Sequence, residues 1–116
     1  MKTHGSDKAR TAWTEAETRE LISLYDTMRS MDRDGLLGRR KDQASKKDLI
    51  LAWLRDNAPH RSRGSVEAKL MNISASCEAS GFEILVGYKP LRNRAASLDA
   101  LVASMLSACL LLMVAA

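Results

Sequence analysis

Apolar side chains recur every three or four residues through most of this sequence, and that spacing constrains the fold more than any other feature. The clearest run consists of Leu21, Leu24, Tyr25, Met28 and Met31. Residues spaced in this way share one face of a helix that has 3.6 residues per turn. Thr14 and Glu17 stand where a capping box would begin such a helix. We therefore predict a helix over roughly residues 15–31, with Trp13 folded back onto it.

Three more helices are predicted from their start and stop signals. Ser45 is placed to cap a helix over about 46–57, which ends before a proline. Ser62 is placed to cap a second over 63–79, which stops at a serine and a glycine. Ser97 is placed to cap a last, apolar helix over 97–116. The fold class expected from these signals is all-α.

The expected organisation is a single domain with a tail and one added helix. Residues 1–12 read as a mobile polar tail, residues 13–80 as a three-helix domain and residues 81–96 as a connecting segment. A loop with two glycines is expected over 32–44. The chain begins without an apolar segment typical of a signal peptide, so we expect a cytoplasmic protein.

Composition narrows the class of function. The net charge of +4 and the pI of about 9.3 favour a polyanionic partner such as double-stranded DNA. Two cysteines and two histidines show no zinc-binding spacing, so no metal and no cofactor are expected. No nucleophile with a nearby base and no glycine-rich phosphate loop is visible. We therefore expect a protein that is not an enzyme.

The predicted helix over 63–79 has an asymmetric polar surface. Its apolar stripe comprises Val66, Leu70, Ile73 and Cys77. Beside that stripe lies a sector without acids, which contains Ser65, Lys69, Asn72 and Ser76, with Ala68 just beyond it. Phosphates repel carboxylates, so this sector is suited to a DNA groove. Asparagine can read adenine, and lysine can reach guanine or phosphate. The residues predicted to face bases are Ser65, Ala68, Lys69 and Asn72.

A second set of residues is predicted to contact phosphates. Arg61 and Arg63 stand at the start of the same helix, where unpaired backbone amides also attract anions. A basic run precedes and enters the helix over 46–57, with five basic residues against one acid. That run contributes Arg39, Arg40, Lys41, Lys46 and Lys47.

Two of these stretches resemble a known family. Trp13-Thr14-Glu15-Ala16-Glu17 resembles the W-T-x-E-E opening of Myb/SANT-like domains. The stretch RSRGSVEAKLMNIS, which starts at Arg61, resembles the third-helix segment of bacterial and phage Myb-like domains, some of them fused to HNH nucleases. Their R-T-x-x-A-V-x-x-K-L-x-N pattern maps onto Arg61, Ser62, Ser65, Val66, Lys69, Leu70 and Asn72.

The resemblance covers roughly residues 13–80 and carries several implications. It implies a three-helix bundle of the helix-turn-helix type, with the helix over 63–79 in the major groove. A transcriptional or mobile-element regulator would fit such a fold. The family spaces three tryptophans evenly, whereas this chain has only Trp13 and Trp53. It also lacks the residues of an HNH centre, so nuclease chemistry is not implied.

Several alternatives remain open at the level of sequence. Residues 100–116 carry no charge. They fit a fourth helix packed on the bundle, a homodimer contact, a membrane anchor or a tail foreign to the domain. Myb/SANT-like bundles also bind protein tails. A protein-interaction module and a small membrane-tethered protein are therefore the alternatives to a DNA-binding protein.

Overall fold

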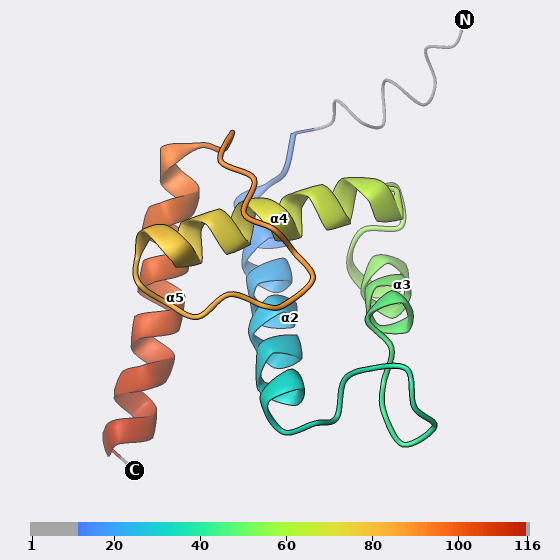
Figure 1. Ribbon diagram of the computed structural model, residues 1–116. Coiled ribbons are helices and arrows are strands. Elements are labelled where there is room, and N and C mark those ends of the chain that lie inside the picture. The colour runs from blue at the N-terminus through green and yellow to red at the C-terminus, as the bar shows by residue number, and fades with distance from the viewer. Residues whose placement is uncertain (1–11, 116) are drawn as a thin grey trace, which may run out of the picture.

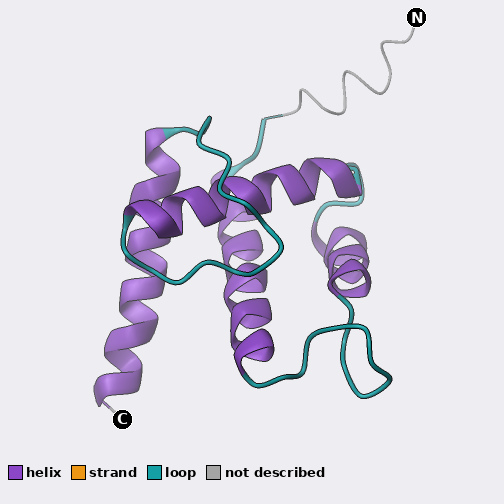
Figure 2. Ribbon diagram, viewed as in Figure 1, coloured by secondary structure: helices purple, strands orange, loops and turns teal. Residues whose placement is uncertain are grey.

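The computed structural model describes residues 12–115, and for residues 107–115 it describes the backbone alone. This part of the chain contains four helices and no strand (Figures 1 and 2). They are α2 (Glu15–Arg33), α3 (Lys46–Asn57), α4 (Arg63–Ala79) and α5 (Ala96–Ala115). The prediction of an all-α fold is confirmed. The tail predicted over 1–12 lies, apart from its last residue, outside the described residues.

Three of the predicted helix starts are confirmed by their capping bonds. The Thr14 hydroxyl accepts a hydrogen bond from the Glu17 amide at 3.1 Å, and the Glu17 carboxylate accepts one from the Thr14 amide at 3.0 Å. The Ser45 hydroxyl accepts from the amide of Asp48 at 3.0 Å. The Ser62 hydroxyl accepts from the third amide of α4 at 3.1 Å. These bonds satisfy amides that have no partner inside the helix.

Two helix boundaries differ from those predicted. The first predicted helix continues two residues further, to Arg33, and the chain then turns at Gly35 with φ 73°. Ser97 does not cap the last helix, which already begins at Ala96. Its first turn carries Asp99, which bonds to α4. The start of α5 therefore coincides with a tertiary contact that local sequence signals do not reveal.

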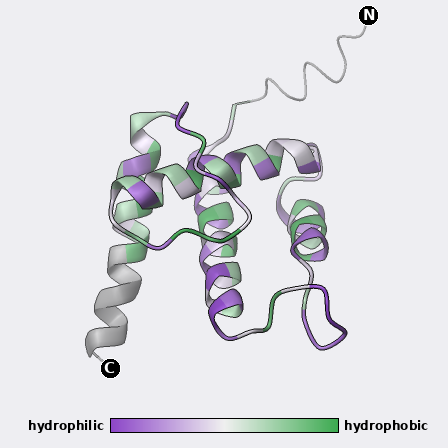
Figure 3. Cartoon of the chain, viewed as in Figure 1, coloured by the Kyte–Doolittle hydropathy of each residue, from purple (hydrophilic) through white to green (hydrophobic). Residues whose placement is uncertain are grey.

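The core is built from one apolar stripe of each helix. Its fully buried members include Leu21, Ile22, Tyr25 and Met28 of α2 and Ile50 of α3. The predicted stripe of α4, Val66, Leu70, Ile73 and Cys77, is confirmed, since each of these residues is 0% exposed. The helix α5 adds Leu98, Val102 and Leu106, and its most extensive contacts are with α4. Figure 3 shows hydrophobic and hydrophilic positions alternating along the helices.

The segment that connects α4 to α5, residues 80–95, is part of the core. We call it the return segment. Figure 1 shows it running back across α4. Leu85 and Tyr88 are buried, and the Leu85 amide donates to the Tyr25 hydroxyl at 2.8 Å. That hydroxyl also shares a hydrogen bond of 2.8 Å with the Ser74 hydroxyl of α4. The return segment is therefore fixed to both α2 and α4.

The structure also bears on the two ends of the described chain. At the N-terminal end, the ring of Trp13 stacks on the ring of Trp53 in α3, with the two centroids 6.2 Å apart. None of the helices within residues 12–115 combines the length and the apolar character needed to cross a membrane.

Candidate nucleic-acid interface

The stretch of α4 from Ile73 to Cys77 is enclosed on every side. Residues Ile73, Ser74, Ala75, Ser76 and Cys77 are all buried, and one turn of a helix takes only 3.6 residues. Five consecutive buried residues therefore leave no side of this part of α4 exposed. A helix that enters the major groove must present an open face to the bases. Residues 73–77 of α4 have no such face.

Asn72 was predicted to face bases, and the structure places its side-chain nitrogen against the return segment. Its side-chain nitrogen donates to the Leu91 carbonyl at 2.7 Å and to the Asn93 carbonyl at 3.2 Å. The Leu91 amide in turn donates to the Met71 carbonyl of α4 at 3.0 Å. The Asn72 amide thus holds the return segment against α4, which explains why a carboxamide suits this position.

The acid-free sector of α4 faces protein where it was expected to face phosphate. At its far end, the Ser76 hydroxyl donates to the Asp99 carboxylate of α5 at 2.5 Å. Arg94 also binds this carboxylate through two nitrogens, at 2.7 and 3.0 Å. The Arg94 guanidinium, and after it the Ser76 hydroxyl, lower the pKa of Asp99. The carboxylate that meets this sector therefore belongs to α5 and not to α4.

Lys69 was the second residue predicted to face bases, and it also faces the protein. Its side chain is half-buried, and its Nζ lies 5.7 Å from the centre of the Trp13 ring. Burial lowers the pKa of Lys69, and the charge of Arg61 lowers it further. The ammonium lines a pocket between α2, α4 and α5. Lys69 therefore lies beside Trp13 and the first turns of α5.

Arg61 was predicted to bind phosphate, and the structure places it in a buried ion pair. Only 1% of its side chain is exposed. Its Nη2 donates to Glu17 Oε1 at 2.8 Å, and its Nε donates to Glu17 Oε2 at 3.2 Å. The same Nη2 donates to the Ala12 carbonyl at 2.8 Å, and the guanidinium lies 4.2 Å from the Trp13 ring centre. The prediction for Arg61 is therefore wrong, because the group is enclosed by protein.

Glu17 is the partner of Arg61, a role that its position in the capping box does not predict. The Arg61 guanidinium lowers the pKa of Glu17 to about 2, against an ordinary value of 4.5. Glu17 and Arg61 are 44 positions apart, so helical spacing cannot pair them. A buried arginine–carboxylate pair joins the start of α2 to the turn before α4 and has little scope to bind a ligand.

The first turns of α4 keep some exposure. Arg63 is exposed and lies 3.6 Å from the Glu67 carboxylate, with 44% of its side chain accessible. Ser65 and Ala68 are half-buried. These three residues belong to the N-terminal part of α4, which the return segment leaves accessible.

A basic surface lies where α3 begins. We use that name for Arg39, Arg40, Lys41, Lys46 and Lys47. All of them are exposed except Lys46, whose Nζ donates to the Val86 carbonyl at 2.5 Å and lies 5.3 Å from the Tyr88 ring centre. A hollow of about 420 Å³ opens among Gly38, Arg39, Ser45, Lys46 and Lys47. The acid of the run, Asp42, is 3.6 Å from Arg40.

The loop that carries this surface is held by Gln43, which the sequence reasoning did not single out. Its side-chain oxygen accepts from the Arg40 amide at 3.0 Å, and its nitrogen donates to the Gly35 carbonyl at 3.1 Å. Leu37 also pairs with Ala44 in an isolated parallel bridge. These contacts give the basic side chains a defined backbone. A glutamine in a polar loop gives no sequence signal for this role.

The described chain is an all-helical domain whose main charged feature is a basic surface at one helix start. Comparison with known proteins identified no matching family model, no matching curated protein and no matching solved structure. The residues themselves therefore carry the argument about function.

Proposed function

We propose that this protein is a non-catalytic DNA-binding protein that grips the phosphates of a duplex with its basic surface. The observation that carries the proposal is the exposure of Arg39, Arg40, Lys41 and Lys47 around the start of α3, where four exposed cations outnumber two acids, Asp42 and Asp48. Exposed cations displace counterions from DNA, and this term supplies nearly all sequence-independent affinity. The positive end of the α3 dipole adds to the same attraction.

The proposed mode of binding keeps a reduced role for α4. In helix-turn-helix proteins the N-terminal residues of the recognition helix make the base contacts. Arg63, Ser65 and Ala68 occupy that part of α4, and each has some exposure. We assign phosphate contact to Arg63 and close approach to the bases to Ser65 and Ala68. We also propose the role of a transcriptional or mobile-element regulator, which the resemblance to bacterial and phage Myb-like domains implies, and a location in the cytoplasm.

Fluorescence anisotropy with a mixed-sequence duplex over a salt series tests this proposal. The triple variant Arg39→Gln, Arg40→Gln, Lys41→Gln removes three charges from the basic surface. Each phosphate contact contributes about 0.9 to the slope of log affinity against log salt, so we expect the slope to fall by about 2 to 3. Affinity should fall for all sequences alike.

A second triple variant controls for net charge. Arg55, Lys89 and Arg92 are exposed basic residues outside the basic surface. Changing all three to glutamine removes the same charge. The slope of log affinity against log salt should stay close to that of the original chain. Equal losses in the two triple variants would contradict a localised interface. A chain that binds no duplex even at low salt would overturn the proposal itself.

A further inference from the structure

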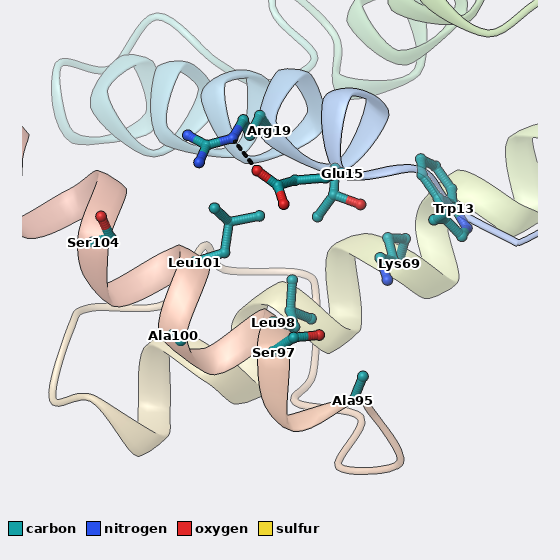
Figure 4. Close-up of a pocket in the computed structure, with 11 residues that line it drawn as sticks. Trp13, Glu15, Arg19, Lys69, Ala95, Ser97, Leu98, Ala100, Leu101 and Ser104 are labelled. Carbon is teal, nitrogen blue, oxygen red and sulfur yellow. Dashed lines mark hydrogen bonds and ion pairs between the residues drawn. The ribbon is translucent and has the colours of Figure 1, made fainter.

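A second hollow lies between α2, α4 and α5 (Figure 4), and none of the residues that line it belongs to the basic surface. Its volume is about 510 Å³, which is within the range of small-molecule sites. Leu98, Ala100 and Leu101 of α5 form an apolar wall, and Trp13 lies at one end. Lys69 projects from α4 toward this space in the close-up view. The hollow thus combines one apolar wall with polar side chains, among them the Lys69 ammonium.

The charges around the hollow favour an anion. Glu15 and Arg19 stand on the α2 side, and their side chains pair with each other at 2.9 Å. That pair is neutral, which leaves the Lys69 ammonium as the uncompensated charge among the described residues that line the hollow. The first turn of α5 adds the positive end of its dipole to the same side. Two serines, Ser97 and Ser104, supply hydroxyls at the margin.

The surroundings of Lys69 also favour the binding of an anion. It is half-buried, close to Trp13 and to the positive charge of Arg61, and both burial and that charge lower its pKa. No hydrogen bond or ion pair of its Nζ is present within residues 12–115. A half-buried ammonium without an opposing charge gains more from a bound carboxylate than a fully exposed one does, because less water screens the pair.

From these observations we infer that the hollow is a binding site for a small aliphatic carboxylate, with Lys69 facing the carboxylate and Ala100 and Leu101 contacting the apolar chain. The ligand class follows from one cation beside an apolar wall of branched side chains. The site is independent of the basic surface, so it does not depend on DNA binding.

The test uses the full chain with hexanoate and its uncharged analogue hexanamide, followed by backbone amide NMR. We expect hexanoate to shift the signals of Ser97, Leu101 and Ser104 in a saturable way. Hexanamide should bind at least tenfold more weakly, because it lacks the charge that faces Lys69. The comparison of hexanoate with hexanamide uses the unaltered chain, so it does not depend on the folding of a variant. Equal affinity for the acid and the amide, or shifts that fall outside the hollow, would overturn the inference.

Variants of Lys69 give a second, independent readout. Lys69→Met keeps most of the side-chain length and removes the charge, so its affinity for hexanoate should fall at least tenfold. Lys69→Arg keeps a charge and should retain most of the binding. Lys89→Met removes an exposed lysine of the return segment and serves as the matched control. Unchanged affinity in Lys69→Met, in a chain that still unfolds cooperatively, would also overturn the inference.

Discussion

At the scale of single residues, polar groups that suit DNA binding can equally hold a fold together. Asn72 and Arg61 have the chemistry to read a base and to grip a phosphate. In the structure, Asn72 binds carbonyls of the return segment and Arg61 binds Glu17. A side chain that can make directed bonds to a ligand can make the same bonds to its own backbone. Position in the fold decides between the two uses.

The Glu17–Arg61 pair predicts a pH dependence of stability. In Glu17→Gln the capping box survives, because glutamine serves at this position, while the charge is lost. We expect the free energy of unfolding at pH 7 to fall by about 1.5–3 kcal/mol. The pKa of Glu17 is about 2 in the fold and 4.5 ordinarily, so the carboxylate stabilises the fold fully above pH 4.5. Its contribution is lost as the pH falls from 4.5 towards 2.

Urea unfolding of the original chain and of Glu17→Gln at several pH values measures this effect. The difference between the two should be largest near pH 7 and should shrink below pH 4.5. A difference that stays constant down to pH 2.5 would show that the charge of Glu17 is not the source.

At the scale of elements, the return segment changes what α4 can do. It crosses α4 and is fixed there by Leu85, Tyr88 and the bonds of Asn72. Its path includes Gly87, where φ is 101°. Residues with a Cβ adopt that backbone at a cost, so the glycine permits the bend that precedes Tyr88.

A pair of glycine substitutions tests this assignment. Gly87→Ala should lower the free energy of unfolding by about 1–2 kcal/mol, because its positive φ disfavours a side chain. The added Cβ would also lie 2.5 Å from Lys46 Nζ, which must move. Gly64→Ala is the control, since that glycine lies in the first turns of α4 and the nearest atom to a new Cβ is 4.0 Å away.

Alanine is the better helix former, so Gly64→Ala should leave the protein unchanged or more stable by up to about 1 kcal/mol. Thermal unfolding of both variants gives the comparison. If Gly87→Ala were as stable as Gly64→Ala, the bend would not require a glycine.

At the scale of the whole molecule, α5 belongs to the core. Leu98, Val102 and Leu106 are each no more than 5% exposed. Burying a side chain of this kind contributes about 1.5–3 kcal/mol. Three of them together approach the net stability of a typical domain, about 5–15 kcal/mol. A domain that ended with α4 would leave this surface of α4 and α2 in water.

Shortening the chain therefore has a predictable effect. A chain ending at Ala95 should lose its cooperative thermal transition, because it lacks Asp99 and the three buried residues of α5. A chain ending at Leu106 keeps these groups and should retain a cooperative transition. Circular dichroism during heating distinguishes the two. A cooperative transition of normal midpoint in the shorter chain would show that residues 12–95 fold alone.

The local features of this fold were predictable from the sequence, and the packing of the return segment against α4 was not. The caps at Ser45 and Ser62 and the apolar stripe of α4 act over one or two turns, so spacing alone predicts them. The acid-free sector around Lys69 and Asn72 was also a correct observation. Acids are absent from a helix face both when it meets phosphate and when it meets protein. Only the path of the return segment distinguishes these cases, and that path depends on contacts far apart in sequence.

The hydrogen bond from the Leu85 amide to the Tyr25 hydroxyl can form only after the chain between them has been synthesised. The two residues are 60 positions apart, and both are buried. A ribosome that adds about 5–20 residues per second needs about 3–12 s to make the intervening chain. During that interval α2 has neither the return segment nor α5 to cover it. The nascent chain consequently carries an uncovered apolar surface for seconds, and a factor that shields such surfaces would act on it before its own last helix can.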